Sequence, residues 1–170
     1  LRGRADLILI LTVVGLVGTF TLNFQLTTAL MATQVYGKGA QEYGLLGSIM
    51  AVGSLAGALL AARRQQPAMR LLLGASAVLG VTTLIAAVMP SYPLFALALV
   101  PIGLSSLTMM TAGNTMVQLS TEPAMRGRVM SVYMAVFLGG TPLGAPIVGW
   151  IGEQYGARWT LIIGGVVALA

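Results

Sequence analysis

Residues 7–31 read LILILTVVGLVGTFTLNFQLTTALM and contain no charged side chain. A helix of about 20 predominantly apolar residues is long enough to cross the hydrocarbon core of a bilayer. Four of its polar residues, Thr12, Thr19, Asn23 and Thr27, are spaced so that they fall on one face at helical periodicity, and Gln34 continues that face. This stretch therefore predicts a membrane-spanning helix with one polar stripe.

The rest of the chain repeats the same composition. Hydrophobic residues make up 57% of it and charged residues 8%, whereas soluble domains carry about 25% charged residues. A membrane-spanning segment must satisfy its own backbone hydrogen bonds, and the alternation of a barrel strand is absent, so the predicted fold is an all-α membrane protein. We expect six transmembrane helices, at about 7–31, 43–62, 71–89, 94–119, 129–152 and 159–170.

The two ends of the sequence suggest a longer protein. The chain starts with Leu1, and its last apolar run stops at Ala170, short of the about 20 residues that a span needs. No domain boundary interrupts residues 1–170. We therefore expect one C-terminal transmembrane bundle whose sixth helix is truncated, with an N-terminal half that is absent from this sequence.

The positive charges predict an orientation. With the start of the chain placed in the cytoplasm, most basic residues fall in cytoplasmic segments: Arg2, Arg4, Arg63, Arg64, Arg70, Arg126 and Arg128. Only Lys38 and Arg158 fall outside. Short cytoplasmic loops are rich in Lys and Arg, so this bias predicts a multi-pass protein of the inner (plasma) membrane with a cytoplasmic start.

Composition also excludes several functions. The net charge of +5 belongs to short loops beside apolar spans, so we expect no nucleic-acid partner. The chain has no histidine and no cysteine, which removes the usual general base and the commonest metal and thiolate ligands. It also lacks the Gly-Lys-Ser/Thr loop that cradles phosphates. We expect no enzyme, no metal and no cofactor.

A second polar stripe lies in the predicted span 94–119. Thr108, Thr111, Thr115 and Gln118 share one face, with Asn114 at its edge. Amide side chains at membrane depth are costly without partners. Two interpretations remain open for both stripes: hydrogen bonds between neighbouring helices, or the lining of a substrate pathway.

Two further spans have unusual composition. Span 43–62 is rich in small residues, including a Gly53–Gly57 pair that allows close helix approach; it predicts either plain helix association or a sliding interface. Span 129–152 contains Pro142 and Pro146, each of which removes a backbone donor. They predict a bend, which is either static or a point where the helix flexes.

These patterns resemble one half of a major facilitator superfamily transporter. The resemblance is carried by YGLLG (43–47) and GSLAGALL (53–60) leading to Arg63-Arg64, by EPAMRGRVMS (122–131), and by PLG (142–144). These stretches are similar to the eighth and eleventh helices of the branch that includes enterobactin exporters and macrolide efflux proteins. The resemblance covers essentially the whole chain, as helices seven to twelve.

The resemblance implies secondary transport by alternating access between two six-helix bundles, here ion-gradient-driven efflux of a drug- or siderophore-like small molecule. In that family the seventh and tenth helices face the cavity, which implies a substrate cavity lined by Thr19, Asn23, Thr27, Thr111, Asn114, Thr115 and Gln118. We expect the arginines Arg63, Arg64, Arg126 and Arg128 to anchor the cytoplasmic ends. The alternative is a noncatalytic six-helix scaffold, or a permease subunit that works with a separate ATPase.

Overall fold

The computed structural model describes residues 5–63 and 68–170, and every regular element in this part of the chain is helical. The elements are α1 (Ala5–Phe20), α2 (Phe24–Leu30), the π-helix η1 (Met31–Val35), α3 (Ala40–Ala62), α4 (Met69–Ala87), α5 (Tyr92–Leu119), α6 (Arg126–Tyr155) and α7 (Ala157–Leu169). The all-helical prediction is confirmed. Five helical segments are long and apolar enough to cross a membrane, and α7 is a shorter apolar helix.

The first predicted span corresponds to one candidate span, Leu7–Val35, but its helix is not continuous. It is interrupted after Phe20, where the Leu22 amide reaches back to the Val17 carbonyl, and it resumes at Phe24 as α2. It then widens into η1, where the Tyr36 amide bonds the Met31 carbonyl. Both irregularities lengthen the hydrogen-bonded turn and change the helical phase.

Only the middle part of the polar stripe predicted for the first span is buried or half-buried. Asn23 and Thr27 are buried, whereas Thr12 and Gln34 are exposed, and Thr19 is half-buried. The side chains were expected on one face of a regular helix with about 100° per residue. Thr19, Asn23 and Thr27 stay linked by hydrogen bonds across the interruption, whereas Thr12 on α1 and Gln34 in η1 are exposed.

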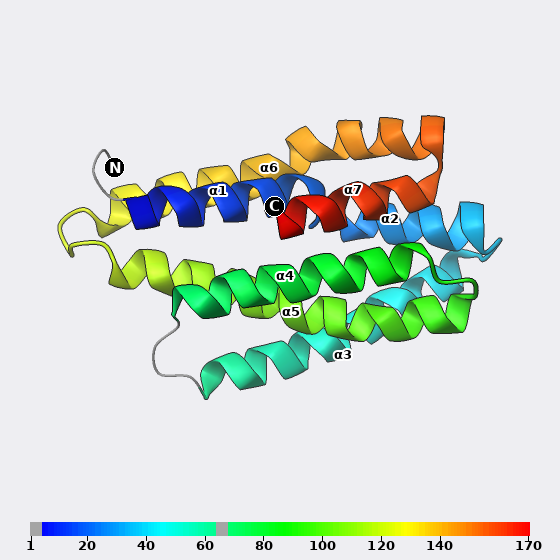
Figure 1. Ribbon diagram of the computed structural model, residues 1–170, viewed down its shortest axis with the longest axis horizontal. Coiled ribbons are helices and arrows are strands. Elements are labelled where there is room, and N and C mark those ends of the chain that lie inside the picture. Colours follow the sequence, from blue (N-terminus) through cyan, green and yellow to red (C-terminus); the bar gives the residue numbers. More distant parts are fainter. Residues whose placement is uncertain (1–4, 64–67) are drawn as a thin grey trace.

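The helices pack side by side along one direction, with α3 and α6 at opposite edges (Figure 1). Helix α5 contacts α3 and α4 extensively, α4 also packs on α7, and α1 packs on α6. The centre is filled by fully buried apolar side chains, among them Ile10, Leu72, Phe95, Leu99 and Met109. Large apolar side chains on α3 and α6 remain exposed, as expected for surfaces in contact with lipid or with further protein.

Glycines allow the helices of this bundle to approach closely. A Cβ added to Gly53 would lie 2.0 Å from the Val100 carbonyl oxygen, and one added to Gly103 would lie 2.2 Å from the Met50 carbonyl oxygen. Helices α3 and α5 are therefore in backbone contact, which is how small residues hold transmembrane helices together. The prolines of α6, Pro142 and Pro146, lie inside a helix that continues through both.

The basic residues of the described chain lie at the two ends of the bundle. Arg63, Arg70, Arg126 and Arg128 are exposed at or near helix termini at one end, where α3 ends and α4 and α6 begin (Figure 1). Lys38 and Arg158 lie at the opposite end, next to the starts of α3 and α7. Arg64, also predicted as an anchor, lies outside the described residues.

Candidate functional site

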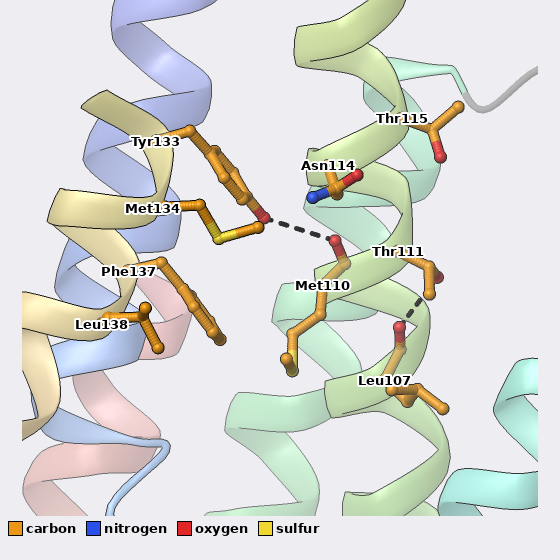
Figure 2. Close-up of a pocket in the computed structure, with 9 residues that line it drawn as sticks. All are labelled: Leu107, Met110, Thr111, Asn114, Thr115, Tyr133, Met134, Phe137 and Leu138. Carbon is orange, nitrogen blue, oxygen red and sulfur yellow. Dashed lines mark hydrogen bonds between the residues drawn. The ribbon is translucent and has the colours of Figure 1, made fainter. Parts of the chain in front are cut away.

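A hollow between α5 and α6 holds three of the predicted cavity residues. It has a volume of about 290 Å³, and its two walls are side chains of these two helices (Figure 2). Helix α5 contributes Leu107, Met110, Thr111, Asn114 and Thr115, and helix α6 contributes Tyr133, Met134, Phe137 and Leu138. Thr111, Asn114 and Thr115, which the sequence placed on one stripe, do lie together.

Asn114 is held in place by the fourth predicted residue of the same helix. Gln118 is exposed one turn further along α5, and its Nε2 donates a hydrogen bond to Asn114 Oδ1 over 2.5 Å. The oxygen of the Asn114 amide thereby accepts one hydrogen bond. The nitrogen lies on the side of the amide that faces α6 (Figure 2), so it can donate to a group within the hollow.

Two hydroxyl groups that line the hollow donate to carbonyls of α5. Thr111 Oγ1 donates to the Leu107 carbonyl at 2.8 Å, and Tyr133 OH contacts the Met110 carbonyl at the long distance of 3.5 Å. The Leu107 bond is the usual way in which a threonine satisfies its donor inside an apolar helix. The Thr111 oxygen can still accept a hydrogen bond, which leaves an amide donor and hydroxyl acceptors on the α5 wall.

The α6 wall is aromatic and apolar, and it was not predicted as part of the site. The rings of Tyr133 and Phe137 are nearly parallel, with an angle of 5° and centroids 6.2 Å apart. Met134 and Leu138 follow each of them by one position, so the four residues form two successive turns of one helix face. The i, i+1, i+4, i+5 spacing of large apolar residues was the only sequence signal for this wall.

Asn23, Thr19 and Thr27 do not line this hollow. They lie where α1 is interrupted, against α6: Asn23 Nδ2 donates to the Thr19 carbonyl at 2.6 Å, and Thr27 Oγ1 donates to the Asn23 carbonyl at 3.0 Å. Thr19 Oγ1 bonds the Gly15 carbonyl at 2.7 Å. The structure thus separates the two predicted stripes, and the α1 set bonds the irregular backbone of its own segment.

At the end of the bundle that carries Arg158, two side chains bond the backbone where α4 ends. The Arg158 guanidinium donates to the carbonyls of Ala87 and Met89, each at 3.2 Å. Tyr36 OH donates to the same Met89 carbonyl at 2.9 Å. Partial burial raises the pKa of the Tyr36 phenol, and the nearby Arg158 charge opposes this rise. These bonds supply donors to carbonyls that have no partner within the helix where α4 ends.

The described residues contain no group of three or more His, Cys, Asp or Glu side chains placed to hold a metal ion. None of the residues that line the hollow carries a carboxylate, an ammonium or a guanidinium group. The arrangement can therefore bind a molecule through contact area and neutral hydrogen bonds.

Comparison with known proteins gives one match. The sequence model of the Major Facilitator Superfamily matches residues 8–170. No curated protein and no solved structure matches the chain.

Proposed function

The chain belongs to the major facilitator superfamily, and from this premise we propose that it is half of an ion-gradient-driven exporter of small organic molecules. Membership makes it a multi-pass membrane protein that carries out secondary transport of a small-molecule substrate across a lipid bilayer, and not an enzyme. Export, the coupling to an ion gradient, and the drug- or siderophore-like cargo of the enterobactin and macrolide efflux branch are the proposed part.

The observation that supports a substrate contact in this chain is the hollow between α5 and α6. Asn114 lines it at membrane depth, with its amide oxygen bonded to Gln118 and its nitrogen toward the opposite helix. An amide in an apolar environment is costly unless its groups find partners. A transported molecule that enters the hollow supplies such a partner for the nitrogen.

Two helices of this bundle would face a second bundle in the proposed mechanism. Alternating access moves two six-helix bundles about a site between them. Helices α3 and α6 lie at the edges and expose large side chains such as Leu55, Leu143 and Trp150. We assign the second bundle to an N-terminal half of the same transporter, with Arg63, Arg64, Arg126 and Arg128 anchoring the cytoplasmic ends.

The charges of the two ends support an orientation in the plasma membrane. The end with Arg63, Arg70, Arg126 and Arg128 is the more basic end, and in short loops such residues stay in the cytoplasm. The exported molecule would then cross the plasma membrane from this cytoplasmic end toward the outer end, which carries Lys38 and Arg158. The described spans place no acidic residue at mid-membrane, so the coupling residue of the proposed exporter lies near an end or in the second bundle.

Accumulation assays in cells test the site. Cells that express the transporter with Asn114→Leu should retain more of an exported compound than wild-type cells at equal expression, because the hollow loses its only amide. Ser48→Ala, which changes an exposed side chain of α3 that bonds only to its own helix, serves as the control. Wild-type export of every tested compound by Asn114→Leu would overturn the assignment.

The energy source separates the proposed exporter from a permease subunit that works with an ATPase. An uncoupler that collapses the ion gradient should stop export from energised membrane vesicles even when ATP is present. Export that continues under these conditions and stops when ATP is removed would contradict the gradient-driven mechanism.

A further inference from the structure

The walls of the α5–α6 hollow differ in chemistry, and this difference restricts what can bind there. One wall offers the Asn114 nitrogen as a hydrogen-bond donor beside the hydroxyl groups of Thr111 and Thr115, and the other offers the rings of Tyr133 and Phe137 (Figure 2). Met110 and Met134 face each other from the two helices and complete the apolar surface. A bound molecule must therefore accept a hydrogen bond on one side and pack against aromatic rings on the other.

The orientation of the Asn114 amide selects for an acceptor. Its oxygen receives the Gln118 hydrogen bond and keeps one further lone pair, whereas the NH₂, which can only donate, lies on the side that faces α6 (Figure 2). Gln118 touches Asn114 from outside the hollow and is not among the lining residues. It is therefore a positioning residue, and the ligand atom opposite Asn114 must be a carbonyl, ether or ring-nitrogen acceptor.

The aromatic wall favours a flat ring. Tyr133 and Phe137 project from successive turns of α6 with nearly parallel rings whose centroids lie 6.2 Å apart, so they form an aromatic surface of two parallel rings. Aromatic rings gain by stacking on or against such a surface beyond the area that they bury. The two methionines are flexible and polarisable, and they adapt to rings of different outline.

The absence of charge in the lining disfavours ions. None of the side chains around the hollow is acidic or basic, and α5 and α6 lie within apolar spans. A ligand with a full charge would have to leave water without a counter-charge, which is expensive in such surroundings. The volume of about 290 Å³ is near the lower limit of ligand pockets, which fits one or two fused rings.

We propose that this hollow binds uncharged aromatic molecules that present a hydrogen-bond acceptor to Asn114. The proposal rests on the proposed function, because it names the substrate class of the same site. It assigns Asn114 to acceptor recognition, Gln118 to the orientation of that amide, and Phe137 to ring contact.

Four naphthalenes of similar shape test each part. 2-Acetylnaphthalene carries a carbonyl acceptor, 2-isopropenylnaphthalene replaces it with a CH₂ group of similar size, and 2-naphthoate and 2-naphthyltrimethylammonium carry opposite charges. Binding is measured by equilibrium dialysis against the purified transporter in nanodiscs, with empty nanodiscs subtracted. No gradient is needed, so the result does not depend on whether the protein exports.

Wild-type protein should bind 2-acetylnaphthalene about three- to tenfold more tightly than the isopropenyl analogue, the size expected for one neutral hydrogen bond. Both ions should bind more weakly than the ketone. Asn114→Leu and Gln118→Leu should bring the ratio between ketone and alkene close to one, and Phe137→Leu should weaken both neutral compounds while keeping their ratio. A merely structural role of Gln118 would not change this ratio.

Several results would overturn the proposal. Tighter binding of either ion, or an equal ratio in wild type and Asn114→Leu, contradicts acceptor recognition. If a lipid chain or another helix fills the hollow, none of the naphthalenes binds above the level of empty nanodiscs. Failed export of a compound that does bind with the expected ratio counts against the proposed function and leaves the assignment of the hollow intact.

Discussion

The carbonyl oxygen of Thr19 lies so close to Gly144 that a Cβ added to this glycine would be 1.7 Å from it. The same added atom would lie 2.8 Å from Asn23 Nδ2, the group that donates to the Thr19 carbonyl. The interrupted end of α1 thus rests directly on the backbone of α6. Only glycine leaves room for this contact, so Gly144 fixes how these two helices are placed.

Gly144→Ala should therefore destabilise the protein. The added methyl group meets backbone, which cannot turn away as a side-chain tip can, and overpacking of this kind costs about 1–3 kcal/mol or more. Unfolding by SDS in mixed micelles measures the effect. Gly139→Ala is the matched control on the same helix, because nothing lies within 4 Å of its added Cβ. A Gly144→Ala protein as stable as the Gly139→Ala protein would show that the two helices are not in backbone contact.

A second pair of glycines tests the contact between α3 and α5. Gly53→Ala should weaken the bundle, since its Cβ would lie 2.0 Å from the Val100 carbonyl oxygen, and we again expect a loss of about 1–3 kcal/mol. Gly47→Ala, six positions earlier on α3, meets nothing within 4 Å and should gain slightly from helix propensity. Equal melting temperatures of the two variants in detergent would refute this packing.

The small residues of α3 show what helix periodicity can predict. The Gly53–Gly57 pair was expected to pack, and both glycines are buried against α5. Gly44 and Gly47 belong to the same small-residue span but remain exposed. Small residues indicate that a helix can approach another helix closely. Which face of the helix makes the contact depends on where the partner helix lies, and this cannot be read from a single sequence.

The candidate site was predicted on one helix and missed on the other. Polar residues in an apolar span are costly, so Thr111, Asn114 and Thr115 stood out in the sequence. Tyr133 and Phe137 are ordinary residues for a membrane helix and gave no such signal. The interruption of α1 after Phe20 was also missed, since no proline or charge marks it, and nothing in the sequence indicated that Asn23 would bond the irregular backbone there.

Arg158 offers a prediction at the other end of the bundle. Arg158→Gln should lower the free energy of unfolding by about 1–2 kcal/mol, because the carbonyls of Ala87 and Met89 lose charge-assisted hydrogen bonds. The exposed Arg126 makes a suitable comparison, and Arg126→Gln should change stability little. If both substitutions change the free energy of unfolding equally in SDS titrations, the Arg158 hydrogen bonds do not stabilise the protein.

Tyr36 makes the stability of this end dependent on alkaline pH. Its hydroxyl donates to the Met89 carbonyl at 2.9 Å, and burial raises its pKa above the ordinary 10.0. Below pH 10 the phenol is protonated in both the folded and the unfolded protein, so its contribution to stability is fully present. As the pH rises toward the folded pKa, the unfolded chain releases the proton first, and this contribution is lost.

The unfolding midpoint of the wild-type protein should therefore fall more steeply above pH 10 than that of Tyr36→Phe, which has no proton to lose. Below pH 10 the wild-type protein should be the more stable of the two, because phenylalanine leaves the Met89 carbonyl without its second donor. Arg158→Gln removes the positive charge that opposes the rise in the Tyr36 pKa, so the alkaline loss should begin at the same pH, continue to higher pH and be larger in total. Parallel pH profiles for wild type and Tyr36→Phe would mean that the phenol ionises equally in the folded and unfolded states, and the hydrogen bond to Met89 would then not hold this end together.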